Sequence, residues 1–368
     1  MYGKAFAPEY QGALGSLSVN SPLPEVLAEG VRQLEAARRR GAADEVARCG
    51  LAVAEAHRRL GNVDEAEQAW RDSYRTARSA GDVGAMAWAV WSGGTLARQR
   101  GRLALSRRLL AIAAELGERG QDVVARGYSL AGLAETGRIQ GDYEGVRVLH
   151  EKLLAEARAR GEARHTVWAL EGIAQIHRQT GDWDTALEMF EEAALISREA
   201  DDRRGHAWAL RGIADILSAR GDAPERALEL LSEAEVTCRT MGLTSALAYN
   251  HKMRANVFYR AGRYEEARVF YAGALEQFRD MRELRGEALA RLGLVKTLAR
   301  LGRDRAATGA ELDALAGQLD RVGLQHARRM VDEARRELGL TADTQVRGDE
   351  AEHREAAGRL TAGVGGRR

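Results

Sequence analysis

A glycine that recurs at an almost constant interval constrains this sequence more than any other feature. It is found at Gly61, Gly101, Gly141, Gly181, Gly221, Gly262 and Gly302, with spacings of 40, 40, 40, 40, 41 and 40 residues. The segments GDYEGV and GDWDTA show the pattern best: the glycine closes one helical pattern and an acidic residue follows at the start of the next. A fixed period of this length indicates an array of repeated helix-turn-helix units.

A weaker break lies about half a period from each of these glycines, as in Ala80-Gly81-Asp82 and Arg160-Gly161-Glu162. Each repeat therefore contains two helices of about 18 residues, for example 163–180 (helix A) and 183–200 (helix B), each roughly 27 Å long. Seven such pairs fit between about 42 and 323, with a leading helix near 24–40 and a trailing helix near 324–339. Only four prolines and few β-branched residues agree with an all-α fold.

Three glycines, Gly132, Gly172 and Gly212, lie inside predicted A helices. Each costs about 1 kcal/mol relative to alanine in a helix interior. We expect either close packing or access to the surface to account for them.

The charge balance and the cysteines narrow the function classes. Lys and Arg total 55 against 54 for Asp and Glu, with the two signs interleaved, so no global field attracts nucleic acid or an anionic membrane. Cys49 and Cys238 are far apart and lie in helical patterns, which favours two buried, reduced thiols. No apolar run approaches the roughly 20 residues that span a bilayer, and no signal peptide is evident, so we expect a cytoplasmic protein.

The corner Gly181-Asp182-Trp183, with Ala186 three positions further on and Phe190 four beyond it, resembles the tetratricopeptide repeat. The resemblance covers about residues 42–323 and implies a right-handed superhelical solenoid of about seven antiparallel helix pairs with capping helices. The 40-residue period is similar to that of the arrays in actinobacterial transcription regulators and signalling adaptors. No helix-turn-helix or nucleotide-binding segment is present, which disfavours a DNA-binding regulator.

An aromatic column is the main candidate for a binding surface. On a helical wheel of 163–180, Trp168 falls opposite the apolar side formed by Leu170, Ile173 and Ala174. The same position in successive repeats is occupied by Trp88, Tyr128, Trp168, Trp208, Tyr249 and finally Leu289. In the family this face of helix A lines the concave groove. The rings either face a ligand there or fill the seam between neighbouring A helices, and the two possibilities are compatible.

Charged and polar residues accompany the column. Four arginines, Arg58, Arg98, Arg138 and Arg178, recur 40 residues apart one turn before the corner glycine. They are placed either to stabilise the helix C-terminus or to bind a ligand's acidic groups. The remaining candidates on this face are Trp91, Glu135, Glu171, Gln175, Arg211, Asp215, Lys252 and Asn256. Lys252 and Asn256 have the spacing of the family's carboxylate-clamp residues.

These features predict a non-catalytic scaffold or regulatory protein that holds a protein or peptide partner in an aromatic and arginine-lined groove. The alternative is a receptor for a small hydrophobic or anionic molecule, or an enzyme of specialised metabolism, with its pocket inside the solenoid. In that case the acid-base candidates are Glu135, Glu171, Asp215, His165, His206 and His251. No phosphate-binding loop, dinucleotide fingerprint or metal-ligand spacing occurs, so no cofactor or metal is expected; homo-oligomerisation through the solenoid ends stays open.

The two ends differ from the repeats. Residues 1–22 contain Tyr2, Phe6, Tyr10 and Leu14, which is too apolar for a plain tail, and form an N-terminal arm that either covers part of the groove or caps the stack. The solenoid extends over 23–340. Residues 341–368 are polar and lack the apolar period, so we expect a disordered C-terminal tail.

Overall fold

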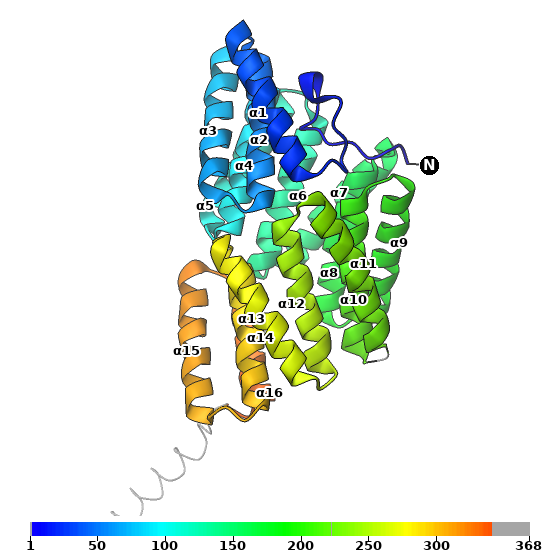
Figure 1. The fold of residues 1–368 in the computed structure, drawn as a ribbon. Helices are drawn as coiled ribbons and strands as arrows, with labels where there is room; N and C mark the ends of the chain where they lie inside the picture. Colours follow the sequence, from blue (N-terminus) through cyan, green and yellow to red (C-terminus); the bar gives the residue numbers. More distant parts are fainter. Residues whose placement is uncertain (1, 222, 341–368) are drawn as a thin grey trace, which may run out of the picture.

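The computed structural model describes residues 2–221 and 223–340, which form sixteen α-helices and a short 3-10 helix, η1 (Gly12–Leu14), without a strand (Figure 1). A leading helix, α1 (Leu23–Arg40), precedes seven antiparallel pairs, and α16 (Gln325–Glu337) follows them. The predicted all-α solenoid, a right-handed superhelix of helix pairs with capping helices, is confirmed. The predicted C-terminal tail, 341–368, lies outside the described residues.

The first helix of each pair corresponds to the predicted helix A and faces the inside of the superhelix. These are α2 (Ala43–Leu60), α4 (Val83–Gln99), α6 (Val123–Gln140), α8 (Ala163–Thr180), α10 (Arg203–Arg220), α12 (Thr244–Arg260) and α14 (Leu284–Arg300). The second helices form the outer layer. These are α3 (Val63–Ala80), α5 (Leu103–Arg119), α7 (Tyr143–Arg160), α9 (Trp183–Glu199), α11 (Pro224–Met241), α13 (Tyr264–Asp280) and α15 (Arg305–Val322).

The corner between helix A and helix B depends on a left-handed glycine. All seven corner glycines have a positive φ, from +70° at Gly101 to +95° at Gly302, a conformation that costs other residues 1–2 kcal/mol. In the fourth repeat Asp182 then caps the next helix, because its Oδ1 accepts a hydrogen bond from the backbone N–H of Thr185 at 3.3 Å. The half-period breaks use glycine less strictly, with Gln121, Asp201 and Arg282 also at positive φ.

The helix-interior glycines are explained by packing. A Cβ on Gly212 would collide with the ring of Phe190, which projects from α9 and is 1% exposed. Gly172 faces the His150 ring of α7 in the same way, and Gly132 faces Leu110 of α5. Each large side chain of a B helix therefore inserts against the backbone of the A helix of the following repeat, which brings the repeats into close contact.

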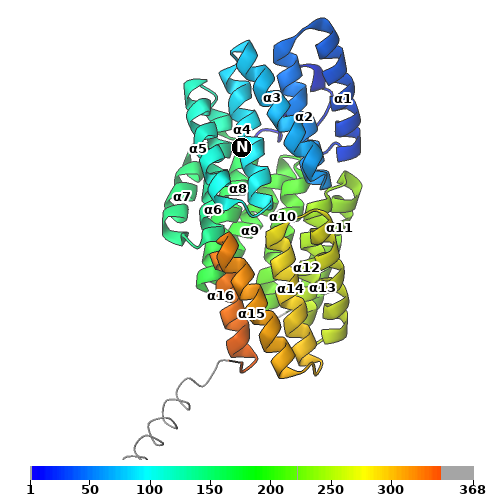
Figure 2. The ribbon, with the colours of Figure 1, turned by 90° about the vertical axis from the view of Figure 1, so that its left-hand side faces the viewer.

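The superhelix closes on itself after its seven pairs. Helix α16 packs against α6, and α12 approaches α2, so that α14, α15 and α16 lie beneath α4 and α6 in both views (Figures 1 and 2). Corner glycines of the early repeats take part: a Cβ on Gly61 would meet Met281 at 2.7 Å, and one on Gly101 would meet Leu284 at 3.2 Å. Across the same seam, Tyr143 Oη lies 2.9 Å from His326 Nδ1.

Both cysteines, Cys49 and Cys238, are buried free thiols. Within the described ranges, none of the helices combines the length and the apolar character that a membrane span requires.

We expect Gly212→Ala to destabilise the protein by roughly 1–3 kcal/mol, because the added methyl group overpacks the contact with Phe190. Gly273→Ala is the matched control: Gly273 also lies within a helix, but nothing stands within 4 Å of its added Cβ, so it should stabilise by about 0.5–1 kcal/mol. Urea unfolding of the two variants measures both changes. Equal effects would show that helix propensity, rather than packing, governs these positions.

Candidate functional site

The closed superhelix surrounds a cavity of about 680 Å³, lined by the inner faces of α2, α4, α6, α8, α10, α12, α14 and α16. The structure brings most of the predicted site residues to its wall. These are Trp91, Trp168, Trp208, Tyr249, Arg98, Arg138, Arg178, Glu135, Glu171, Gln175, Arg211, Asp215, Lys252 and Asn256. Trp88 and Tyr128 do not line it.

The N-terminal part of the aromatic column fills the seam between A helices. Trp88, Trp91 and Tyr128 pack edge to face with ring centroids 5.1–5.5 Å apart, and Trp88 and Tyr128 are 8% and 3% exposed. The indole N–H of Trp88 donates to Asp122 Oδ2 at 2.8 Å. The placement of Trp88 and Tyr128 as groove anchors therefore differs from the structure, because the neighbouring A helices are close enough to cover both rings.

The later part of the column faces the cavity. Trp168 and Trp208 are half-buried and nearly parallel, with centroids 6.4 Å apart and planes at 16°. The guanidinium of Arg204 lies 5.4 Å from the Trp208 ring centre. Tyr249 also lines the cavity and donates a hydrogen bond to Glu283 Oε1 at 2.5 Å. This wall offers aromatic faces beside cations, a combination that suits both apolar and anionic groups.

The arginines of the ladder point into the cavity, and most bind carboxylates there. Arg138 pairs with Glu135 at 2.7 Å and Arg178 with Asp215 at 3.1 Å. Arg98 donates only to the backbone oxygen of Gly132, at 3.2 Å. Arg58 pairs with Glu55 at 2.7 Å. An arginine that only stabilised the C-terminus of its helix would not need these side-chain and backbone partners.

Three further candidates are held by polar contacts of their own. Arg178 Nε donates to Gln175 Oε1 at 3.0 Å, and Arg211 donates to the backbone oxygen of Ala246 at 3.1 Å. Asn256 Oδ1 accepts from the Tyr271 hydroxyl at 2.7 Å. Asn256 is thereby oriented by the helix behind it.

The titratable groups of the wall have opposite pKa shifts. Burial raises the pKa of Glu171 to about 8, only partly offset by Arg211, and its Oε1 is buried with no hydrogen-bond partner among the described residues. Burial alone would also raise the pKa of Glu135, but Arg138, Arg285 and Arg98 hold it well below the ordinary value. Burial also raises the pKa of Glu283, whereas at Asp215 burial is outweighed by arginines that lower the pKa, so the cavity contains carboxyl groups with shifts of both signs.

The histidines proposed as acid-base candidates do not line the cavity. His165 packs on the Tyr128 ring with centroids 4.2 Å apart and lies 3.1 Å from Glu162, while His206 and His251 face Glu233 and Glu235. Their wheel positions lie beside the aromatic column, yet the seam between repeats covers them. In the part of the chain that the structure describes, no three His, Cys, Asp or Glu side chains cluster in a way that could hold a metal ion.

Several cavity residues were not predicted from the sequence, because they reach the cavity only where the superhelix closes on itself. Arg285 at the start of α14 and His326 and Arg329 in α16 complete the wall opposite Arg98 and Arg138. The signal for Arg329 was present: it lies 40 residues after Leu289 and occupies the next position of the aromatic column. No comparable signal identifies His326.

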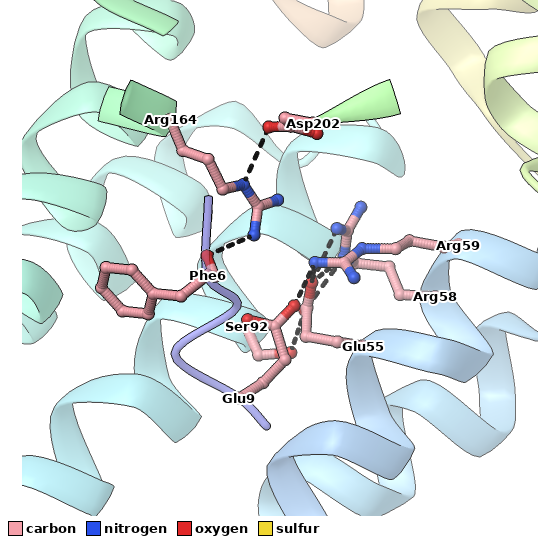
Figure 3. A network of polar contacts seen from close by, with 8 residues as sticks. All are labelled: Phe6, Glu9, Glu55, Arg58, Arg59, Ser92, Arg164 and Asp202. Carbon is pink, nitrogen blue, oxygen red and sulfur yellow. Dashed lines mark hydrogen bonds and ion pairs between the residues drawn. The ribbon is translucent and has the colours of Figure 1, made fainter. Parts of the chain in front are cut away.

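The N-terminal arm reaches the mouth of the cavity. Ala5 N donates to Ala200 O at 2.8 Å, Arg164 donates to Phe6 O at 3.1 Å, and Glu9 Oε1 lies 2.8 Å from Arg59 (Figure 3). The Glu9 side chain is 4% exposed, and although burial opposes ionisation, Arg59 and Arg164 lower its pKa.

Further along the arm, Leu14 is fully buried against Cys49 and Ala52 of α2. The arm therefore both covers the first helices and spans from α2 to α8 and the start of α10, where Asp202 is the partner of Arg164 at 3.3 Å.

Comparison with known proteins agrees with this architecture. Residues 165–235 match the family model of the tetratricopeptide repeat. A Rap protein complexed with competence and sporulation factor has a similar structure, with a TM-score of 0.55 and 14% identity, covering 86% of this chain and 99% of that chain. A Rap conjugation gene regulator in complex with a Phr peptide has a TM-score of 0.57 and 14% identity, covering 81% of this chain and 78% of that chain. No curated protein matches this sequence. At this identity the structural likeness concerns the fold.

We expect Glu9→Gln to destabilise the protein by roughly 2–4 kcal/mol, because it leaves a buried arginine with one carboxylate fewer. The variant should also expose residues 2–22 to limited proteolysis. Glu191→Gln, an exposed carboxylate on α9, is the control and should change neither property. Unaltered stability and protease resistance in Glu9→Gln would show that the arm is held by its apolar residues alone.

Glu171 should make the protein less stable as pH rises. Its folded-state pKa is raised, so the folded chain keeps a proton that the unfolded chain releases near pH 4.5, and stability falls between pH 4.5 and 8. Glu171→Gln mimics the protonated form. We expect the free energy of unfolding of this variant to exceed that of the wild type by roughly 1–2 kcal/mol at pH 8 and to equal it at pH 4.

Glu135→Gln is the matched control of opposite sign. The pKa of Glu135 is lowered, so this variant should cost stability at pH 7, and the cost should shrink as pH falls below about 4.5. Urea unfolding at several pH values measures both variants. The same pH dependence in both would contradict the assigned environments.

Proposed function

We propose, from the premise that this chain is a tetratricopeptide-repeat protein, that it is a non-catalytic regulatory protein which binds a short, extended peptide inside its superhelix. The observation that carries the proposal is the cavity of about 680 Å³, whose wall combines half-buried aromatic rings with arginines. Aromatic and arginine side chains contribute most of the binding energy at protein interfaces. A cavity of this size suits a segment of chain better than a folded domain.

Two further observations support a peptide. Both Rap proteins of similar fold are complexes, one with competence and sporulation factor and one with a Phr peptide. In this chain, Arg164 of the A helix α8 already donates a hydrogen bond to the backbone oxygen of Phe6 in the non-helical arm. An arginine of an A helix can therefore bind a peptide backbone, as recognition of a peptide ligand requires.

A second candidate is a small-molecule receptor or an enzyme that uses the same cavity. It is favoured by two groups with pKa values near neutrality: Glu171, raised to about 8 by burial, and Lys252, lowered to about 8 by burial and by the arginines around it. Groups of this kind can exchange protons with a ligand. Mass spectrometry of metabolites retained by the protein from a small-molecule extract, with Glu171→Gln as the comparison, tests this candidate.

The peptide proposal is tested with a pool of random hexapeptides. The full-length protein is mixed with the pool and passed over a size-exclusion column, and peptides that elute with the protein are identified by mass spectrometry. We expect a defined subset to be retained. Retention of metabolites but no hexapeptide would favour the second candidate instead.

Trp208→Ala should lower the affinity for the retained peptides by about 30-fold, because loss of a central aromatic anchor costs about 2 kcal/mol of binding free energy. Trp183→Ala is the matched control, since Trp183 is 38% exposed on the outer layer and should leave binding unchanged. Fluorescence titration of one retained peptide measures both variants. An equal loss in both, or none in either, would place the binding surface outside the cavity.

A further inference from the structure

Six cations of the cavity wall make no salt bridge in the part of the chain that the structure describes; two of them, Arg204 and Arg211, lie on α10. The other four come from four different helices. Arg98, Lys252, Arg285 and Arg329 come from α4, α12, α14 and α16, and within residues 2–221 and 223–340 none of them makes a salt bridge. Arg98 has one hydrogen bond, to a backbone oxygen, and Arg329 lies over the Tyr143 ring at 4.9 Å. These four residues are called the cation cluster below.

The remaining arginines of the same wall, apart from Arg204 and Arg211, pair with carboxylates. Arg138 binds Glu135 at 2.7 Å, and Asp215 is shared by Arg178 at 3.1 Å and Arg260 at 2.8 Å. The wall as a whole carries ten arginines and one lysine but only five carboxyl groups, although the chain has a net charge of +1. The positive charge is therefore concentrated inside the cavity.

The surplus has an energetic cost for the empty protein. Arg285 contributes to this cost: after burial, its charge is among those that lower the pKa of Arg98, Lys252 and His326. Like charges held together in a partly desolvated site repel one another. An arrangement of this kind is expected where a ligand supplies the missing negative charge.

Unpartnered polar atoms of the same wall indicate a built site. The side-chain atoms Thr95 Oγ1, Arg138 Nη1 and both ring nitrogens of His150 are buried without a hydrogen-bond partner among the described residues. These three residues are 3–5% exposed and line the cavity. The wall therefore contains donors and acceptors that the chain itself does not satisfy.

The arm shows which chemistry this wall accepts. At the mouth of the cavity, Glu9 supplies the carboxylate for Arg59, and Arg164 binds the backbone oxygen of Phe6 three residues before it (Figure 3). A non-helical segment with an acidic residue thus satisfies two arginines at once. Deeper in the cavity, the cation cluster offers cationic side chains of the same kind. The arm does not occupy this cluster.

We propose that the cation cluster binds the carboxylates of an acidic peptide, and so links the early repeats to the C-terminal helices. The inference rests on the proposed peptide-binding function and adds the class of ligand. The carboxylates come either from Asp and Glu side chains or from the free C-terminus of the peptide. Because Arg98 lies on α4 and Arg329 on α16, a ligand that bridges them also stabilises the closed superhelix.

The test uses the full-length chain and two versions of the random hexapeptide pool, one with free and one with amidated C-termini. We expect the retained peptides to be enriched about tenfold or more in acidic groups over the input, since charge-assisted hydrogen bonds are the stronger ones. Enrichment that persists with the amidated pool assigns the cluster to acidic side chains. Retention of the free pool without acidic enrichment, lost with the amidated pool, assigns it to the terminal carboxylate.

The decisive variant is Arg285→Gln combined with Lys252→Gln. It should abolish the acidic enrichment while the melting temperature stays equal or rises, because repulsion is removed. Arg107→Gln with Arg108→Gln removes the same charge from the exposed face of α5 and should leave the enrichment intact.

Each remaining outcome is decisive. Peptide retention by the wild type that shows no acidic enrichment and is equal for the free and the amidated pools overturns the inference but leaves the proposed function standing. Acidic enrichment that survives in the Arg285 and Lys252 variant also overturns it. No retention of any hexapeptide by the wild type contradicts the proposed function and the inference together.

Discussion

The contact between the last helices and the corners of the early repeats is the constraint on which the cavity depends. An open superhelix would present the inner faces of its A helices to solvent as a groove. Here α16 packs against α6, Tyr143 meets His326, and Gly61 and Gly101 allow Met281 and Leu284 to approach their backbones. These contacts convert the groove into a cavity. Partial desolvation then strengthens the electrostatic interactions between the charged groups inside it. The repulsion between Arg98 of α4 and Arg285 of α14 depends on this closure, because the two helices are far apart in the sequence.

The corner glycines illustrate how one residue type meets two requirements. At every corner, the positive φ alone explains glycine. At Gly141 a side chain would in addition collide with the guanidinium of Arg329, so the lack of a Cβ there also permits the closure. The local turn and the long-range contact are coupled through the same position, which connects the repeat pattern with the shape of the cavity.

Much of the fold could be predicted from the repeat. The helix pair 163–180 and 183–200 was predicted to within one residue, as α8 and α9 show, because corner glycines and caps are local signals. Closure could not be predicted, since it depends on the sum of small rotations between repeats, which no local pattern encodes. The candidate site was predictable where it follows the period, as at Trp168, Trp208 and Arg178, and missed where α14 and α16 contribute. Whether these residues bind a ligand stays a prediction.

The helical wheel also has a limit that this molecule makes clear. In an A helix both faces are buried, one against the B helices and the other toward the cavity, so burial does not separate core from site. Asp215 and Leu210 are 3% and 6% exposed, yet Leu210 packs in an apolar cluster while Asp215 is held by two arginines. The distinction lies in the partners. Leu210 packs with apolar residues of α10 and α11, whereas Asp215 is held by Arg178 of α8 and Arg260 of α12. Arg98, Lys252, Arg285 and Arg329 make no salt bridge among the described residues.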